Sequence, residues 1–401
     1  MMAEASPETP QEAPLIYLIA GEPSGDRLGA RLMSALKAEH PGPLRFRGIG
    51  GEMMAREGLA SLFPITDLAV MGLAEVLPRL PRLLRRIRET VDDIAASNPA
   101  ILVTIDAPDF GLRVARKVRV RKTGNKDIPL IHYVAPSVWA WKAGRARKMA
   151  AYLDGVMTLL PFEPAYFTRV GLAAEFVGHP VLESDAAKAD GWAFRARHGI
   201  ARDARVACLL PGSRAGEIDR LMPVLRQTTE LLGDRYPDLS YVLPTVSHME
   251  ARVRKHLAGW SRQPLIVTGE TEKFDAFAAS NVAIAASGTV ALELAMARIP
   301  NVIIYKMNPV TSWLARKLVK SKYVNLVNIL LDEEAVPELL LEDCRPEWIA
   351  DETSKLLSDA EAVARQRRRL ADAMAKLSRD GLSPSRAAAQ AVLRAMKKGR
   401  S

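Results

Sequence analysis

The sequence predicts an α/β protein built from two doubly wound, Rossmann-like domains. Short, nearly continuous apolar runs alternate with helix-like segments, which is typical of parallel strands covered by helices on both faces. The alternation pauses between residues 180 and 200 and then resumes, so each half is expected to form its own sheet. The length of 401 residues also favours two domains, because a chain this long is rarely organised around a single hydrophobic core.

Strands in the first half are predicted at residues 15–20, 100–105, 129–133 and 155–160, with a further strand that ends at 176–180. A helix over residues 27–39 is expected after the first strand. Strands in the second half are predicted at residues 205–210, 240–243, 264–267, 282–285 and 301–305. Ligands of such sheets bind at the carboxyl ends of the strands, so a site is expected there and in a cleft between the domains.

The domain boundaries follow from this pattern. We expect a disordered tail over residues 1–14, an N-terminal domain over 15–185, a C-terminal domain over 186–360, and helices over 361–401 that pack across to the N-terminal domain. The first of these helices is expected to present one apolar face, formed by Val363, Leu370, Met374 and Leu377. Gly381 should end that helix, and Ser383 with Pro384 should begin the last one.

Charge and composition limit the classes of function. The formal net charge of +10 favours anionic partners such as phosphorylated molecules or an acidic membrane face. Nucleic acid ranks last among them, because aromatic residues are only 6% and no DNA-binding motif occurs. The two distant cysteines suggest no disulfide, and the six histidines lack metal-ligand spacing. The acidic start of the chain does not resemble a signal peptide, and no apolar run is long enough to span a membrane.

Glycine-containing loops after predicted strands are candidates for binding a nucleotide sugar. The first carries Gly21, Glu22, Ser24 and Asp26, whose polar side chains could bond sugar hydroxyls. A tight turn with Asp26 as a helix cap explains the same residues equally well. The spacing is not that of the dinucleotide fingerprint, so NAD is not indicated. The glycine cluster at 48–51 could line an acceptor site or form a plain hairpin or turn.

Two loops of the second half are candidates for holding a diphosphate. Both follow strands and precede helices, where free N–H groups favour phosphate. Their candidate residues are Ser213, Arg214, Glu217, Ser287, Gly288, Thr289 and Glu293. Arg214 offers a charged fork, although it could instead be a solvated partner of Glu217. Glu293 lies on an apolar helix, where a carboxylate is costly without a partner, and it could accept both hydroxyls of a ribose.

Asp106 is the candidate catalytic base. It comes directly off the strand at 100–105, and a base at that edge could take the proton from an attacking hydroxyl. Asp109 is the second choice and could be a turn or cap residue, since turns favour aspartate. No Asp-x-Asp pair occurs, so helix termini and Arg214, rather than a metal ion, are expected to neutralise a leaving diphosphate.

Apolar residues beside dense arginine suggest contact with a membrane surface. The residues concerned are Val70, Met71, Leu73, Val76, Leu77, Arg82, Arg85 and Arg86. Such a segment suits an interfacial helix on anionic lipid, or an entrance for acyl chains. The alternative for the helix over 78–96 is an ordinary packed helix with a solvated basic face.

Motifs in this order resemble one family, the lipid-A-disaccharide synthases. In the first half they are residues 20–26 (AGEPSGD), 69–72 (AVMG), 75–77 (EVL), 105–110 (IDAPDF), 132–141 (HYVAPSVWAW) and 159–163 (LLPFE). In the second half they are residues 178–179 (GH), 210–214 (LPGSR), 286–289 (ASGT), 292–293 (LE) and 323–328 (YVNLVN). The match runs from about residue 15 to 345, and the stretch at 136–141 is highly specific.

The resemblance implies a GT-B fold with an acceptor-binding first domain, a UDP-binding second domain and a last helix that crosses back to the first. It implies an inverting transfer that joins UDP-2,3-diacylglucosamine to 2,3-diacylglucosamine 1-phosphate, gives the β-1,6-linked disaccharide 1-phosphate and releases UDP. No metal or other cofactor is expected. The implied place is the cytosolic face of the inner membrane of a Gram-negative bacterium, with peripheral lipid contact, and some members form homodimers.

Residue by residue, the resemblance matches Asp106 to the family's proposed base, and Arg214 and Asn328 to positions tied to its activity. Glu293 matches a nucleotide-binding glutamate of GT-B enzymes more generally. Three residues depart from the usual pattern, namely Pro23, Gly111 and Val327.

Two rival functions remain at this point. Another UDP-sugar enzyme, such as a cell-wall N-acetylglucosamine transferase or a 2-epimerase, would share the Ser-Gly-Thr loop and Glu293. The arginine-rich stretch and residues 136–141 favour a lipid acceptor instead. A two-domain protein that binds a nucleotide sugar without chemistry is the non-enzyme rival. Asp106 itself could be the base or could only position the acceptor, and we take the base as the hypothesis.

Overall fold

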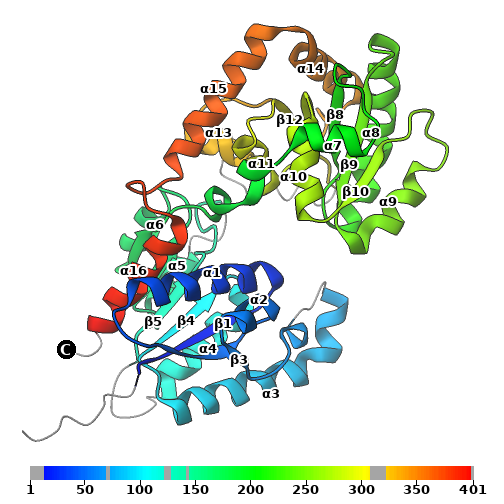
Figure 1. The fold of residues 1–401 in the computed structure, drawn as a ribbon. Helices are drawn as coiled ribbons and strands as arrows, with labels where there is room; N and C mark the ends of the chain where they lie inside the picture. The colour runs from blue at the N-terminus through cyan, green and yellow to red at the C-terminus, as the bar shows by residue number, and fades with distance from the viewer. Residues whose placement is uncertain (1–12, 69–72, 122–127, 141–143, 308–321, 399–401) are drawn as a thin grey trace, which may run out of the picture. The chain divides into compact units, whose positions relative to one another are not determined.

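The protein folds as two compact units, each with one parallel sheet between layers of helices (Figure 1). The computed structural model describes residues 13–68, 73–121, 128–140, 144–307 and 322–398, with side chains from 81 onward in the second range. One unit comprises Met1–Pro180 with Ser378–Ser401, and the other comprises Val181–Leu377. The predicted α/β class with two Rossmann-like domains is confirmed. The division after Pro180 falls five residues before the boundary expected from the sequence.

The first unit alternates strands with helices along the chain. Its strands are β1 (Leu15–Ala20), β2 (Arg45–Ile49), β3 (Ala60–Ser61), β4 (Ile101–Ile105), β5 (Leu130–Tyr133), β6 (Gly155–Thr158) and β7 (Ala173–Phe176). Its helices are α1 (Pro23–Glu39), α2 (Glu52–Arg56), η1 (Ile65–Asp67), α3 (Leu73–Ser97), α4 (Pro108–Arg121), α5 (Gly144–Ala150), α6 (Pro164–Thr168) and α16 (Pro384–Lys398). A short 3-10 helix, η2 (Pro180–Glu183), leads into the second unit.

The first sheet has the strand order β3-β2-β1-β4-β5-β6-β7, and each pair is parallel. Strand β1 shows why both faces are covered. Its residues Ile16 and Leu18 enter a core shared with α1 and α16, whereas Tyr17 and Ile19 enter a core shared with α3 and α4. Since successive side chains of a strand point to opposite faces, a run with no charged residue can be buried on both sides.

The second unit repeats the same alternation. Its strands are β8 (Val206–Leu210), β9 (Ser240–Thr245), β10 (Leu265–Thr268), β11 (Val282–Ala286), β12 (Asn301–Tyr305) and β13 (Glu338–Leu340). Its helices are η3 (Asp185–Lys188), α7 (Gly191–Arg197), α8 (Ala215–Arg235), η4 (Ser247–Met249), α9 (Glu250–Leu257), α10 (Glu270–Ala279), α11 (Val290–Met296), α13 (Leu326–Leu331), α14 (Pro346–Ser358) and α15 (Ala360–Lys376).

The second sheet has the strand order β10-β9-β8-β11-β12-β13, again all parallel. Leu209 of β8 and Ile284 of β11 join a core with Leu221 of α8 and Ile349 of α14 on one face. Helices α10 and α11 contact strands of the same sheet, and their buried side chains include Phe274, Phe277 and Leu292.

The two C-terminal helices belong to different units. Helix α15 packs on α11, α13 and α14, so it stays with the second unit, although the sequence analysis placed both helices against the first. Its buried residues include Leu370 and Met374 of the predicted apolar face. The chain turns at Gly381, which has a φ of 71°, and α16 then packs on α1. Only the last helix therefore returns to the first unit.

Two local expectations differ from the structure. Helix α1 begins at Pro23 rather than residue 27, because proline suits the first turn, where its missing N–H costs nothing. The cluster at 48–51 is not a hairpin, since β2 runs parallel to β1 and the glycines connect it to α2. The proposed role of that cluster in lining an acceptor site stays a prediction.

Candidate active site

In the first sheet the strand order reverses between β1 and β4, and the candidate base follows the second of these strands. The two strands pair up to Ala20 and Ile105, so the loops after them start side by side. In an open parallel sheet this reversal point is where ligands bind. Gly21, Glu22 and Ser24 come from one loop and Asp106 from the other, so the sheet brings together residues about eighty positions apart.

Asp106 is half-buried and is held by two hydrogen bonds. The Ser24 hydroxyl donates a hydrogen bond to its Oδ2 at 2.8 Å, and its own N–H donates to the Tyr133 carbonyl at 2.9 Å. The backbone at Asp106 has a φ of 51° and that at Ala107 a φ of 33°. Residues other than glycine rarely adopt this left-handed conformation, and such strain occurs preferentially at functional sites.

Two glycines permit the close approach of the loops. A Cβ at position 21 would lie 2.7 Å from the Cβ of Ala107, and one at position 25 would lie 3.2 Å from the Ile105 carbonyl oxygen. Any larger residue at Gly21 would push the loop away from Asp106. The glycines of this motif are therefore needed for packing between β1 and β4, independently of any ligand.

Asp26 has a structural role that the sequence analysis offered as the alternative. It is buried in the first turn of α1, and its carboxylate accepts the N–H groups of Gly51, Met53 and Met54 at 2.7–3.1 Å. It thus caps the start of α2. Glu22 lies exposed at the N-cap position of α1.

Asp109 differs from Asp106 in every respect that bears on catalysis. It lies in the first turn of α4 with 95% of its side chain exposed, and Arg145 is its ion-pair partner at 4.0 Å. Gly111 of the same helix packs on Thr104, where a Cβ would approach the Thr104 Cβ to 2.9 Å. Glycine at position 111, which departs from the family pattern, is therefore explained by the close approach of α4 to Thr104.

The reversal point of the second sheet lies between β8 and β11, and both predicted phosphate loops follow these strands. Leu210 pairs with Ala285, so Ser213 and Arg214 emerge beside Ser287. Ser213, Gly288 and Thr289 are exposed, and Ser287 is half-buried. The structure thus places the two loops at one edge of one sheet, as expected for a bound nucleotide.

Arg214 and Glu217 form the ion pair that the sequence analysis named as an alternative to phosphate binding. One guanidinium nitrogen of Arg214 donates to Glu217 Oε1 at 2.9 Å. The other oxygen, Oε2, accepts the N–H groups of Ser213 and Arg214 at 3.2 and 3.3 Å. The buried Glu217 carboxylate therefore shapes the loop, while 78% of the Arg214 side chain stays exposed with donors to spare.

Glu293 has a partner that the sequence analysis missed. The Lys273 ammonium, from α10, lies 2.8 and 2.9 Å from its two carboxylate oxygens, and both side chains are 25% exposed. Lys273 supplies the partner that a half-buried carboxylate needs. A lysine one turn into a helix gives no sequence signal for such a contact. The role of Glu293 toward a nucleotide stays a prediction.

Asn328 is fully buried, and its side chain is used within the protein. Its amide nitrogen donates to the Val336 carbonyl and to Glu338 at 2.8 Å, and its oxygen accepts the Val336 N–H at 2.9 Å. Val327 is also buried, and its N–H bonds the side chain of Asn325. These contacts fasten α13 to β13 and to the segment before it, so we expect any effect of Asn328 on activity to act through the position of α13.

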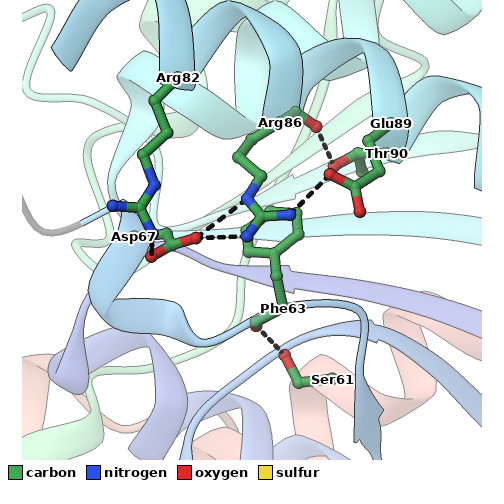
Figure 2. Close-up of polar contacts among 7 residues, drawn as sticks. All are labelled: Ser61, Phe63, Asp67, Arg82, Arg86, Glu89 and Thr90. Atoms are coloured by element: carbon green, nitrogen blue, oxygen red, sulfur yellow. Dashed lines mark hydrogen bonds and ion pairs between the residues drawn. The ribbon is translucent and has the colours of Figure 1, made fainter.

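Of the three arginines predicted to face a membrane, two are ion-paired within the protein, and of these Arg86 is largely covered whereas Arg82 stays 56% exposed. Arg82 and Arg86 both bond the Asp67 carboxylate, and Arg86 also bonds Glu89 and lies over the Phe63 ring at 4.4 Å (Figure 2). The hydrogen bonds from Arg86 and Arg82 hold the pKa of Asp67 below its ordinary value.

Arg85 lies on the outer face of α3. It is exposed, and it makes no ion pair within the described residues. Val70 and Met71 lie outside the described residues, as do the side chains of Leu73, Val76 and Leu77. No helix in the described part of the chain is long and apolar enough to cross a membrane.

The loops after β5 and β6 meet at another buried carboxylate, which the sequence analysis quoted only within a motif. Glu163 accepts N–H groups from Leu159, Leu160 and the Trp139 indole. An acid between apolar residues was the only signal for it. Among the described residues no group of three or more His, Cys, Asp or Glu side chains is placed to hold a metal ion.

Comparison of the whole sequence with known proteins decides the family. The model described as Lipid-A-disaccharide synthetase matches residues 16–393. A lipid-A-disaccharide synthase of Rhodospirillum centenum is 51% identical over 384 residues, which cover 96% of this chain and 95% of the relative. One from Paramagnetospirillum magneticum is 50% identical over 388 residues, which cover 96% and 98%.

The chain belongs to the lipid-A-disaccharide synthase family. This confirms the predicted resemblance and, with it, a glycosyltransferase that makes the lipid A disaccharide. The rival enzymes that share the UDP-sugar fold are set aside by these matches across nearly the whole chain.

Solved structures show that the fold extends beyond the lipid-A-disaccharide synthases. A putative UDP-N-acetylglucosamine 2-epimerase from Listeria monocytogenes superposes with a TM-score of 0.65 at 12% identity, covering 98% of this chain and 97% of the other. A UDP-GlcNAc 2-epimerase from Neisseria meningitidis, bound to UDP-GlcNAc, gives 0.60 at 11%, covering 96% and 99%. At such low identity the likeness shows the fold alone.

Proposed function

We propose that the chain joins UDP-2,3-diacylglucosamine to 2,3-diacylglucosamine 1-phosphate. A hydroxyl oxygen of the acceptor attacks the anomeric carbon of the donor as the bond from that carbon to UDP breaks. The proton of the attacking hydroxyl passes to Asp106, and UDP leaves. Attack from the side opposite to UDP inverts the anomeric centre and gives the β-1,6-linked disaccharide 1-phosphate.

The observation that carries this proposal is the setting of Asp106. Its carboxylate stands at the reversal point of the first sheet, directly after β4, in a backbone conformation that is strained for aspartate. The Ser24 hydroxyl bonds only Oδ2, so Oδ1 can accept a proton from an acceptor hydroxyl. Asp109, with its exposed side chain, lacks such a setting.

We assign the UDP moiety to the loops after β8 and β11. Arg214 would meet the diphosphate with its free donors, and the hydroxyls and N–H groups of Ser287 and Thr289 would add neutral hydrogen bonds. Glu293 would accept the ribose hydroxyls with the lone pairs that Lys273 leaves unused. Because the sequence contains no Asp-x-Asp pair, these groups rather than a divalent ion would stabilise the leaving UDP.

We further propose peripheral contact with the anionic cytosolic face of the inner membrane, because both substrates carry acyl chains. The outer face of α3 suits such contact, since Leu84, Arg85 and Arg88 are exposed there. Exposed arginine attracts anionic lipid, and an exposed leucine can enter the headgroup boundary. Arg82 and Arg86 would fix the position of the helix through their ion pairs with Asp67 (Figure 2).

The test is UDP release from UDP-2,3-diacylglucosamine in detergent with EDTA, with and without 2,3-diacylglucosamine 1-phosphate. Acceptor-dependent release with formation of a disaccharide supports both the transfer and its independence of metal. Release that stops in EDTA and returns with Mg²⁺ would contradict the metal-independent step alone. Turnover of UDP-N-acetylglucosamine without any acceptor would instead support an epimerase.

A further inference from the structure

A buried carboxylate that the proposed chemistry does not use lies at the carboxyl edge of the first sheet. Glu163 is 3% exposed, and its Oε2 accepts the N–H groups of Leu159 and Leu160 at 3.1 and 3.0 Å. Its Oε1 accepts the indole N–H of Trp139 at 3.1 Å. A buried carboxylate is costly without such donors, and here all three are N–H groups.

The three donors come from two different loops. Leu159 and Leu160 follow β6, whereas Trp139 lies in the segment 134–140 that follows β5. The Trp139 ring also meets the Phe162 ring edge to face, with centroids 5.4 Å apart. The carboxylate therefore fastens the β5 loop to the β6 loop and fixes the position of an aromatic pair.

The β5 loop begins next to the proposed base. Tyr133, the last residue of β5, pairs with Ile105, and its carbonyl accepts the N–H of Asp106 at 2.9 Å. The next residue, Val134, has a φ of 73°, and its N–H and that of Ala135 both donate to Met157 at the end of β6. Loops after β4, β5 and β6 thus form one hydrogen-bonded rim.

We infer that Glu163 is a positioning residue for the acceptor. It fixes the β5 loop and Trp139 in a position where the loop forms one side of the acceptor site beside Asp106. The inference rests on the proposed function, because it takes the first unit as the acceptor-binding one. Glu163 touches neither substrate, and it acts through Trp139 and the backbone of the β6 loop.

The ionisation of Glu163 gives the inference a specific readout. Burial raises its pKa to about 7, against the opposing effect of the three N–H donors. The charged residues on elements packed against α6 are Arg145, Arg147 and Lys148 of α5 and Glu175 of β7. The last three are exposed or ion-paired elsewhere, and Arg145 lies against Asp109. Burial and the three N–H groups therefore determine the pKa of Glu163.

Two effects on the Glu163 carboxyl oppose each other, because the three N–H donors favour the ionised form and burial favours the protonated form. Three N–H donors face the two oxygens, so protonation weakens these hydrogen bonds and adds an O–H donor, which loosens the link between the two loops. Between about pH 4.5 and 7 the folded protein binds this proton more tightly than the unfolded chain, so this group lowers folding stability as pH rises. Because ionisation of Glu163 lowers folding stability, the presence of an acid at this position points to a role other than stability.

Glu163→Gln is the decisive variant, because its amide resembles the protonated acid at every pH. In the wild type we expect the KM for 2,3-diacylglucosamine 1-phosphate to rise roughly tenfold as pH falls from 8 to 6. In the variant we expect that KM to be high throughout, apart from a smaller change as the acceptor phosphate itself ionises near pH 6, with the donor KM unchanged. The difference between the two profiles isolates Glu163.

Trp139→Phe is the second variant, since it removes one donor and keeps an aromatic ring. We expect it to raise the acceptor KM with little change in kcat, and to move the ionisation seen in the profile to higher pH. Parallel profiles for the wild type and both variants would overturn the inference. Absence of acceptor-dependent UDP release from the wild type would contradict the proposed function instead, so the two failures can be told apart.

Discussion

Asp106 combines a strained backbone, a half-buried carboxylate and a single side-chain donor. We predict that Asp106→Asn lowers turnover by roughly 10²–10⁴ and leaves the affinity for UDP nearly unchanged, because the amide cannot take a proton. The measurement is kcat for disaccharide formation together with calorimetric binding of UDP. The amide can still accept the Ser24 hydrogen bond, so the loop should keep its shape.

The matched control for this variant is Asp109→Asn, which removes the same charge nearby, in the first turn of α4. Its side chain is 95% exposed, so turnover should change little. Equal losses in both variants would assign the effect to charge in the loop. Loss of UDP binding in Asp106→Asn would remove Asp106 from the role of base.

Lys273 carries the second prediction at this scale. We predict that Lys273→Met weakens UDP binding roughly tenfold, because the Glu293 carboxylate loses the ammonium that orients both its oxygens. Lys255→Met, on the exposed face of α9, is the control with the same loss of charge. Calorimetry on both variants decides the matter. Tighter binding by Lys273→Met would mean that Lys273 competes with the nucleotide for Glu293.

At the scale of the element, three buried carboxylates and one half-buried carboxylate set the shape of four loops. Asp26, Glu163, Glu217 and Glu338 each accept two or three N–H groups of a neighbouring segment. Segments outside helices and strands leave N–H groups unpaired, and a carboxylate can bind several of them at once. Acidic residues in these motifs are therefore as readily structural as catalytic.

Helix α3 offers a matched comparison between paired and unpaired arginines. We predict that the double variant Arg85→Gln, Arg88→Gln weakens binding to vesicles of anionic lipid by roughly thirtyfold, since each arginine near the surface contributes about 1 kcal/mol. The measurement is sedimentation with vesicles at constant ionic strength.

The control is Arg82→Gln, Arg86→Gln, which removes the same charge but breaks the pairing with Asp67. This variant should be less stable to unfolding than the wild type. Its binding to vesicles should fall less than that of Arg85→Gln, Arg88→Gln. If both double variants bind vesicles equally weakly, net charge and not the outer face of α3 governs the contact.

At the scale of the whole molecule, the last helix completes the first unit from the far end of the chain. Val392 and Met396 of α16 are buried in the core that contains Met33 and Leu36 of α1. Arg379 and Arg394 pair with Glu175 beside it. The unit therefore needs residues from both ends of the sequence.

We predict that deletion of residues 379–401 destabilises the first unit by about 3 kcal/mol or more, because several apolar side chains of α1 lose their cover. Denaturation in urea, followed for each unit by limited proteolysis, should show early unfolding of the first unit and little change in the second. Deletion of residues 399–401 is the control. Unchanged stability of the first unit would mean that α16 is dispensable for its fold.

The fold is shared with epimerases at 11–12% identity, so it does not by itself specify the reaction. The strands could be located from the sequence, because residues buried on both faces form apolar runs that no surface loop forms. The short strands β2, β3 and β13 were missed, since Arg45–Ile49 carries two arginines and the others have only two or three residues.

The sequence alone determined the two-domain α/β architecture, the strand ends that carry the candidate loops, and the resemblance that names the family. These depend on local pattern, and local pattern is set by which side chains must leave water. Only the tertiary structure decided which polar side chains are available to a ligand. Asp106 and Ser24 meet because β1 and β4 pair, whereas Asp26 and Asn328 are used inside the protein. The contacts of Lys273 and Glu163 are seen only in the tertiary structure, because they involve segments that are distant in the sequence.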